Sequence, residues 1–267
     1  MGLYQNRIVV KVGTSTLTNE LGKSDLRSFD RLACVLSDIQ NMGYEVILVS
    51  SGAIAAGTNK LGWKTRPVSM KQKQAAAAVG QCSIMFLYDK FFGDYDKTIG
   101  QILLNAEDIR QEEKKENLTN TFNTLLEMGV IPVVNENDSV SYTEIESEDR
   151  LFGDNDMLSA VVAVLCKAKH LVILSDIDGL YDADPRLHPD ARLQKRIDRI
   201  DENVYAFAGG AGSRRGTGGM KTKLQAAAFA SAQGINTTIT NGKKPDGIYR
   251  VIAGESVGTL FVGSGQK

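Results

Sequence analysis

The stretch RIVVKVG, residues 7–13, is a short apolar run rich in β-branched residues that ends in glycine. Such a run predicts a strand that is buried on both faces of a sheet. Lys11 interrupts the apolar pattern, and Gly13 and Thr14 follow it at once, where a small residue lets a ligand approach the backbone closely. A lysine at this position is either an edge residue whose ammonium reaches water or part of a binding site.

Further apolar runs and several helical segments follow this stretch. The predicted strands after the first are 45–52, 98–104, 130–135, 170–176, 235–242 and 258–263. The predicted helices are one capped by Ser24 and stopped by Gly43, one beginning at AIAAG (53–57), one over 69–92, a polar one carrying Leu118 and Phe122, and one over 155–168. Because apolar strands alternate with helices, the sequence predicts an α/β fold with a mostly parallel sheet covered on both faces. No repeat or linker interrupts residues 1–267, so we expect one domain.

The composition argues against several classes of protein. With a formal net charge of −1 at pH 7, the chain lacks the basic excess that is typical of nucleic-acid-binding proteins. Cys34, Cys82 and Cys166 are far apart and form neither a zinc-binding spacing nor a disulfide framework. The apolar run at 159–166 is too short to cross a bilayer, and the N-terminus lacks a signal-peptide core. We therefore expect a cytoplasmic protein with no nucleic-acid or membrane partner.

Four short polar runs come directly after predicted strands. They are KVGTS (11–15), SSGA (50–53), NENDS (135–139) and SDIDG (175–179). Because ligands of parallel sheets bind outside the carboxyl ends of the strands, we expect these runs to line one site. Ser51 and Gly52 immediately precede a helix, where backbone N–H groups favour an anion, although a serine there is also a common helix cap.

Other polar residues of these runs have two interpretations. Asn135, Asn137 and Asp138 suit either a turn or a ligand site. Asp176 and Asp178 either form a turn before a glycine or face a nucleotide or its metal. The residue types alone leave both interpretations open.

Two stretches with charged side chains lie outside these runs. The glycine-rich GTGGMKTK (216–223) precedes an alanine-rich helix but matches neither G-x-x-x-x-G-K-[ST] nor G-x-G-x-x-G, so we interpret it as a phosphate-binding loop of another kind. The stretch FGDNDMLSA (152–160) supplies helix caps, and its carboxylates also suit a substrate ammonium or the steering of lysines. Remote lysines, glycine-rich loops and separate carboxylates suit a direct in-line phosphoryl transfer, which depends on positioning and charge neutralisation more than on a protein nucleophile.

Six stretches together resemble the amino acid kinase family. They are VVKVGTSTLT (9–18), VSSGAIAAG (49–57), KQKQAAAAVGQ (71–81), VVNENDSV (133–140), FGDNDMLSA (152–160) and GTGGMKTKLQAA (216–227). The resemblance keeps this order from about residue 7 to about residue 263. The NEND and GDND pair resembles in particular the branch of the family that phosphorylates glutamate.

The resemblance implies a three-layer α/β sandwich around a mostly parallel central sheet. It also implies ATP-dependent phosphorylation of the side-chain carboxylate of L-glutamate to L-glutamyl 5-phosphate, with Mg²⁺, as the first step of proline biosynthesis. Feedback inhibition by proline and assembly into a homo-oligomer are implied as well. Residues from about 1 to 165 would mainly bind glutamate, and residues from about 166 to 267 would mainly bind ATP. Many members of this branch carry a further C-terminal domain of the PUA type, which we expect this chain to lack because the sequence ends soon after GTLFVG.

The resemblance also implies roles for individual residues. Lys11 and Lys223 would touch the phosphoryl groups, and Asp156 would orient the two lysines. The residues that would bind glutamate are Ser51, Gly52, Asp138 and Asn155. The residues that would bind ATP are Lys11, Gly13, Ser175, Asp176, Thr217, Gly218, Gly219, Met220, Lys221, Thr222 and Lys223. The resemblance assigns no metal ligand to the protein.

Two other functions stay open on the sequence. One is a kinase of the same fold that acts on a nucleoside monophosphate or on another amino acid. The other is a non-catalytic sensor that binds glutamate or proline without turnover. The presence of both Lys11 and Lys223 argues against a sensor, because binding without turnover needs no clamp on a transition state.

Overall fold

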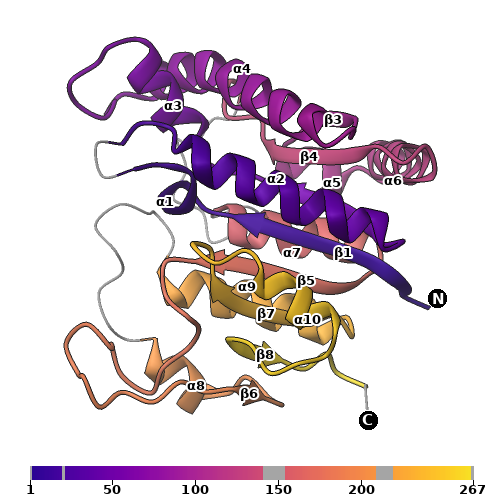
Figure 1. The fold of residues 1–267 in the computed structure, drawn as a ribbon, viewed down its shortest axis with the longest axis vertical. Coiled ribbons are helices and arrows are strands. Elements are labelled where there is room, and N and C mark those ends of the chain that lie inside the picture. Colours follow the sequence, from indigo (N-terminus) through magenta and orange to yellow (C-terminus); the bar gives the residue numbers. More distant parts are fainter. Residues whose placement is uncertain (1, 20–21, 141–153, 209–218, 266–267) are drawn as a thin grey trace.

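A computed structural model describes residues 2–19, 22–140, 154–208 and 219–265 of the chain. Within these residues eight strands form one sheet in the order β3-β4-β2-β1-β5-β7-β8-β6 (Figure 1). The strands are β1 (Tyr4–Val12), β2 (Glu45–Val49), β3 (Ile99–Leu104), β4 (Ile131–Glu136), β5 (Ala168–Ser175), β6 (Arg196–Ile197), β7 (Asn236–Asn241) and β8 (Thr259–Phe261). Neighbouring strands are parallel except for the antiparallel pair β7 and β8. The predicted mostly parallel sheet is therefore confirmed.

Helices cover both faces of this sheet. They are α1 (Thr14–Leu17), α2 (Leu26–Asn41), α3 (Ala53–Lys60), α4 (Met70–Asp94), α5 (Ala106–Arg110), α6 (Glu112–Glu127), α7 (Asn155–Leu165), α8 (Glu202–Phe207), α9 (Met220–Ala232) and α10 (Gly247–Ile252). Apolar residues of α2, α4 and α10 pack on one face, and those of α6, α7 and α9 pack on the other. This arrangement confirms the three-layer sandwich. None of the helices in the described ranges combines the length and the apolar character that a membrane-spanning segment requires.

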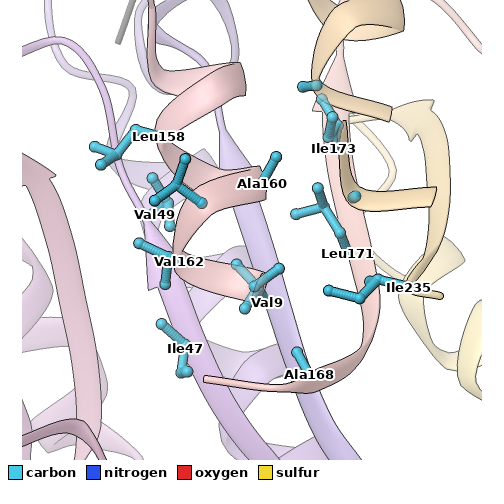
Figure 2. Packing of buried hydrophobic residues seen from close by; sticks show 14 of the residues in the cluster. Val9, Ile47, Val49, Leu158, Ala160, Val162, Ala168, Leu171, Ile173 and Ile235 are labelled. Carbon is cyan, nitrogen blue, oxygen red and sulfur yellow. The ribbon is translucent and has the colours of Figure 1, made fainter. Parts of the chain in front are cut away.

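The centre of strand β1, residues 8–10, is apolar because both faces of the strand are covered. Ile8 and Val10 belong to the hydrophobic cluster beneath α2 and α4, and Val9 belongs to the opposite cluster beneath α7. Figure 2 shows Val9 beside Val162 of α7, with other apolar side chains of α7 next to β2. A central strand that is covered on both sides has no solvent-facing position to fill with a polar residue.

Several predicted boundaries are wrong by a few residues. The cap of α2 is Asp25 instead of Ser24, because its carboxylate accepts hydrogen bonds from the N–H groups of Arg27 and Ser28. Helix α7 ends at Leu165 instead of residue 168, and Lys167, with a φ of 52°, turns the chain into β5. The predicted polar helix that carries Leu118 and Phe122 is α6, and the short helix α5 precedes it.

The edge-lysine interpretation of Lys11 is also wrong. Strand β1 lies in the middle of the sheet between β2 and β5, and Lys11 is only 6% exposed. Strands β4, β2, β1 and β5 are adjacent and parallel, so their carboxyl ends meet at one edge of the sheet. The predicted gathering of the four polar runs at this edge is thereby confirmed.

Candidate active site

The amino end of α7 lies at this carboxyl edge. Helix α7 begins at Asn155 because Asp154 caps it, with the carboxylate Oδ1 accepting hydrogen bonds from the N–H groups of Asp156 at 3.0 Å and Met157 at 3.1 Å. The cap fixes the first turn of the helix, which carries two adjacent polar side chains. These side chains, Asn155 and Asp156, enter two different networks.

Asp156 joins two lysines from distant parts of the chain. Lys11 Nζ lies 2.6 Å from Asp156 Oδ1, and Lys223 Nζ lies 3.1 Å from Asp156 Oδ2. The hydroxyl of Thr222 donates a hydrogen bond to the same Oδ2 at 3.0 Å. All three charged side chains are buried. We call Lys11, Asp156 and Lys223 the charge cluster.

The charge cluster carries an excess of positive charge. Burial alone would raise the pKa of the Asp156 carboxyl, but the charges and hydrogen bonds of Lys11 and Lys223 hold that pKa below its usual range. Asp156 is therefore ionised at neutral pH, and one carboxylate faces two ammonium groups. The amino end of α7 adds its partial positive charge at the same place. Such a site favours an anion such as a phosphate.

Asn155 enters a network of neutral groups. Its side-chain Nδ2 lies within hydrogen-bond distance of the Ser50 carbonyl at 2.6 Å, Ser51 Oγ at 2.8 Å and Asn135 Oδ1 at 2.9 Å. Asn135 in turn donates from Nδ2 to Gln81 Oε1 at 3.0 Å. We call Gln81, Asn135 and Asn155 the amide network. Because Nδ2 of Asn155 faces these acceptors, the carbonyl oxygen of the same planar amide is turned away from them.

The ends of β5 and β7 continue the edge beyond the charge cluster. Ser175 is buried and Asp176 is exposed, and the Ser175 hydroxyl donates to Asp176 Oδ1 at 3.3 Å. The N–H of Gly242 donates to the Ser175 carbonyl at 2.7 Å. Asn241 Nδ2 donates to Asp178 Oδ1 at 2.8 Å, so this carboxylate helps to hold the loop after β5 against β7.

Two predicted glycines of the site lie where the chain turns. Gly52, directly before α3, has a φ of 96°, a conformation that favours glycine. A Cβ atom on Gly52 would lie 3.5 Å from Thr14. A Cβ atom on Gly13 would lie 3.5 Å from Lys11 Nζ, so a side chain there would compete for the space beside the ammonium.

The other predicted residues occupy different positions. Asp138 is half-buried in the turn after β4. Gly219 caps α9 without a side chain, and its carbonyl oxygen lies 2.9 Å from the Thr222 hydroxyl oxygen, within hydrogen-bond distance. Met220 is half-buried and Lys221 is exposed in the first turn of α9. Thr217 and Gly218 lie outside the described residues. The binding roles expected of all these residues stay predictions.

Two members of the amide network, and Asp154 beside them, had no single role assigned from the sequence. Gln81 lies at the end of KQKQAAAAVGQ, where the resemblance marks a motif but no role. Asn135 had a turn and a ligand site as equal interpretations, and the structure shows its side chain bonded to Gln81 and Asn155. Asp154 Oδ2 is buried and has no hydrogen-bond partner among the described residues. Only spatial proximity distinguishes these three residues from ordinary turn and helix residues.

Comparison with solved structures identifies the fold. A uridylate (UMP) kinase from Bacillus anthracis superposes with a TM-score of 0.65 at 14% identity, over 97% of this chain and 96% of the other. A carbamate kinase from Giardia lamblia superposes with a TM-score of 0.67 at 15% identity, over 98% of each chain. The sequence profile described as the amino acid kinase family matches residues 6–241. The chain belongs to the amino acid kinase family.

Comparison of sequences narrows the family to one branch. A glutamate 5-kinase from Clostridium perfringens is 52% identical over 256 residues, which cover 96% of this chain and 95% of the relative. A glutamate 5-kinase from Listeria innocua is 49% identical over 255 residues, covering 96% of this chain and 92% of the relative. Identity at this level over almost the full length groups the chain with the glutamate 5-kinases.

Proposed function

We propose that this chain transfers the γ-phosphoryl group of ATP to the side-chain carboxylate of L-glutamate, giving L-glutamyl 5-phosphate and ADP. The observation that supports phosphoryl transfer is the charge cluster, in which Lys11 and Lys223 share the single carboxylate of Asp156. The similarity to glutamate 5-kinases supports L-glutamate as the substrate. The reaction is the first step of proline biosynthesis.

The charge cluster suits the electrostatic demand of phosphoryl transfer. The γ-phosphoryl group passes between an attacking and a leaving oxygen while negative charge spreads over its equatorial oxygens. Lys11 and Lys223 stabilise this charge, and Asp156 holds both ammonium groups in place before the substrates arrive. Because the groups are buried and fixed, they do not need to reorganise during the reaction. The glutamate carboxylate is itself the nucleophile, so no covalent intermediate with the protein is required.

The donor set fits Mg²⁺ that is carried by the phosphates of ATP. Within the described part of the chain, no group of three or more His, Cys, Asp or Glu side chains is placed to hold a metal. Both oxygens of Asp156 already face ammonium groups. Mg²⁺ in kinases commonly keeps several waters and is bound mainly through substrate phosphates. Bound in this way, the ion neutralises phosphate charge, while the lysines act on the moving group.

Glutamate is bound on the amide-network side of α7. The carbonyl oxygen of Asn155, turned away from the acceptors of its own Nδ2, suits the donors of an α-ammonium group. The buried Oδ2 of Asp154 supplies a negative charge for the same group. Ser51, Gly52 and Asp138 complete this binding region. Residues from about 1 to 165 thus bind mainly glutamate.

ATP is bound on the other side, by residues from about 166 to 267 together with Lys11 and Gly13. Ser175 and Asp176 lie at the end of β5, next to the end of β7. The segment from Thr217 to Lys223 contributes to binding the phosphates. Its described part starts at Gly219, which caps α9 and carries no competing side chain. Helix amino ends favour such an anion.

Three further features are part of the proposal. Proline acts as a feedback inhibitor, because it shares the α-carboxylate and cationic nitrogen of glutamate and so suits the same polar groups. The protein forms a homo-oligomer. A cytoplasmic location suits its free cysteines, Cys34, Cys82 and Cys166.

One assay tests the proposed reaction. ADP release is measured with L-glutamate and Mg-ATP, and hydroxylamine traps the acyl phosphate as a hydroxamate. We expect both products in equal amounts, with ADP release falling to background when glutamate is omitted. Uridylate and L-aspartate serve as competing acceptors. Faster turnover with either of them would assign the chain to another kinase of this fold, and saturable glutamate binding without ADP release would identify a sensor.

A further inference from the structure

Helix α4 carries one buried hydroxyl group into an otherwise apolar contact. Tyr88 is fully buried in the cluster beneath α2 and α4, with its ring centroid 4.9 Å from that of Phe29 and 6.1 Å from that of Phe92. Phenylalanine would fill the same space without a polar group, and a buried hydroxyl costs free energy unless it is hydrogen-bonded. The packing of the ring therefore does not explain the hydroxyl.

The partner of this hydroxyl is Ser50, the first residue after β2. The Tyr88 hydroxyl oxygen lies 2.9 Å from Ser50 Oγ, in a hydrogen bond that either group can donate, and both residues are buried. Ser50 Oγ also lies 3.4 Å from the Ser51 carbonyl, so Tyr88 is its closer partner. Burial raises the pKa of the Tyr88 hydroxyl above its ordinary value of 10.0, so the group keeps its proton at neutral pH.

Ser50 connects Tyr88 to Asn155. The N–H of Ser50 donates to the Val134 carbonyl at 2.8 Å, and its own carbonyl oxygen accepts from Asn155 Nδ2 at 2.6 Å. The hydroxyl of the same residue faces Tyr88. The contact with Tyr88 therefore anchors the residue whose carbonyl oxygen aims the Asn155 amide.

Helix α4 holds a second acceptor of Asn155 in the same way. Gln81 lies about two turns before Tyr88 on the helix and accepts a hydrogen bond from Asn135, whose Oδ1 lies 2.9 Å from Asn155 Nδ2. The two contacts reach the ends of neighbouring strands, β4 and β2, from one helix. Two of the three acceptors around Asn155 Nδ2 are therefore held by side chains of α4.

The position of α4 relative to this edge of the sheet is itself fixed. A Cβ atom on Gly80 would lie 1.7 Å from the carbonyl oxygen of Ala53, so the backbones of α4 and α3 are in contact. Helix α3 begins at Ala53, directly after Gly52. Figure 1 shows the two helices together at one end of the molecule. The helix that presents Tyr88 to Ser50 therefore cannot shift without moving α3.

We propose that Tyr88 is a positioning residue of the site that binds the phosphoryl acceptor. Through Ser50, its hydroxyl holds the Asn155 amide in the orientation that presents the carbonyl oxygen of Asn155 to the acceptor. This role rests on the proposed function, in which that oxygen receives the α-ammonium group of glutamate. Because Tyr88 is fully buried and acts through Ser50, its hydroxyl affects the binding of the acceptor and not that of ATP.

Steady-state kinetics of Tyr88→Phe test the role, because this substitution keeps the ring and its packing and removes only the hydroxyl. We expect KM for glutamate to rise roughly three- to tenfold, the factor that one neutral hydrogen bond contributes, with KM for ATP unchanged. Tyr95→Phe is the matched control. It removes a hydroxyl at the carboxyl end of α4 that donates to Asp30 at 2.9 Å, and it should change neither KM. Circular dichroism checks that both variants are folded, and an unchanged KM for glutamate in Tyr88→Phe, or equal rises for both substrates, would overturn the proposal.

The same substitution in an Asn155→Ala background tests the route. Without the amide of Asn155, adding Tyr88→Phe should raise KM for glutamate by less than about 1.5-fold. A rise as large as in the parent would show that Tyr88 does not act through Asn155.

The parent protein keeps this test separate from that of the proposed function. A parent that phosphorylates uridylate or L-aspartate instead of glutamate would overturn the proposed substrate, and the KM for that acceptor would then decide the role of Tyr88. For a parent that binds glutamate without turnover, the dissociation constant of glutamate takes the place of KM, with the same expected changes.

Discussion

The buried part of strand β1, residues 7–12, carries Arg7 at one end and Lys11 near the other, and these two cations have different partners. Both side chains face α7: Lys11 lies at its amino end, and Arg7 lies at its carboxyl end. Arg7 donates to Glu45 at 2.7 Å, to Asn123 at 3.0 Å and to the carbonyl of Cys166 at 2.8 Å, and it lies over the ring of Tyr4. Lys11 instead shares one carboxylate with a second lysine.

The difference separates a structural charge from one that is available to a ligand. Arg7 is matched by a carboxylate and satisfies the end of α7, where a cation is favourable. Lys11 and Lys223 lie where the helix end is already positive, and both contact the same carboxylate, that of Asp156. Arg7 therefore stabilises the fold, whereas the two ammonium groups of the charge cluster converge at the place where we propose that phosphate binds.

The largest expected effect is that of Lys223→Met on turnover. The substitution keeps much of the length of the side chain but removes an ammonium group that acts in the transition state. We expect kcat to fall roughly 100-fold to 1,000-fold, with a smaller rise in KM for ATP. Because two like charges share one carboxylate, the free energy of unfolding should not fall by more than about 1 kcal/mol.

Steady-state kinetics and urea unfolding check this prediction together. Lys115→Met is the matched control, since Lys115 forms an exposed ion pair with Glu112 on α6 and should change neither quantity measurably. A folded Lys223→Met variant with kcat within a few-fold of the parent would remove Lys223 from the chemistry.

The next effect is that of Arg7→Met on stability. The substitution leaves Glu45 and the Cys166 carbonyl without their donor, so we expect the free energy of unfolding to fall by about 2–3 kcal/mol. The value lies at the low end because Glu45 is 25% exposed and keeps part of its hydration. Activity per folded molecule should stay within about twofold, because Arg7 lies at the far end of α7.

Urea unfolding monitored at 25 °C gives this stability, and assays well below the unfolding midpoint give the activity. Arg196→Met, which breaks the exposed pair with Asp198, is the control and should cost less than about 0.5 kcal/mol. If Arg7→Met lost activity without losing stability, the two ends of β1 would not differ as described.

A smaller effect is expected in the neutral network that adjoins the charge cluster. Gln81→Leu removes the acceptor that orients Asn135, and through Asn135 it acts on Asn155. We expect KM for glutamate to rise about tenfold, corresponding to about 1.4 kcal/mol, with KM for ATP unchanged. Gln81→Glu keeps a side-chain oxygen as acceptor and should restore most of the affinity. An equal loss in both variants, or a change confined to ATP, would show that Gln81 does not act through this hydrogen bond.

The smallest effect concerns a basic side chain that stays neutral. His170 lies on β5 opposite Ile8 of β1 and has Thr238 Oγ1 as a hydrogen-bond partner at 2.8 Å. Burial, together with the charge of Lys169, lowers its pKa from 6.5 to about 4. Below pH 6.5 the unfolded chain therefore binds a proton that the folded protein does not, and the free energy of unfolding should fall until the pH reaches about 4.

Urea unfolding of the parent and of His170→Gln at pH 6.5 and pH 5 isolates this contribution. We expect the parent to lose about 1 kcal/mol more than the variant over this interval, allowing for the partial exposure of the ring. The same loss in both proteins would assign the pH dependence to other groups.

The sequence by itself determined the layers of this protein. Apolar runs such as residues 45–49 specify strands that are covered on both faces, because burial depends on composition that can be read locally. Gly43 and Gly52 mark places where the chain turns, because both adopt positive φ angles, which favour glycine. The position of polar runs after strands was enough to predict one functional edge, because parallel strands end on the same side.

Only the tertiary structure decided what each polar residue does at that edge. Lys11, Asp156 and Lys223 are far apart in the sequence, and the crossover connections of the sheet bring each ammonium group within 3.1 Å of a carboxylate oxygen of Asp156. Neighbouring positions 155 and 156 enter different networks because of what packs beside each one. Electrostatic and hydrogen-bond energies depend on distances of a few ångströms, and a linear spacing cannot supply these. For the same reason, the sequence shows that Arg7 and Lys11 lie on one strand but not which partners they have. Only the structure shows that Arg7 pairs with Glu45, whereas Lys11 shares its carboxylate with a second lysine.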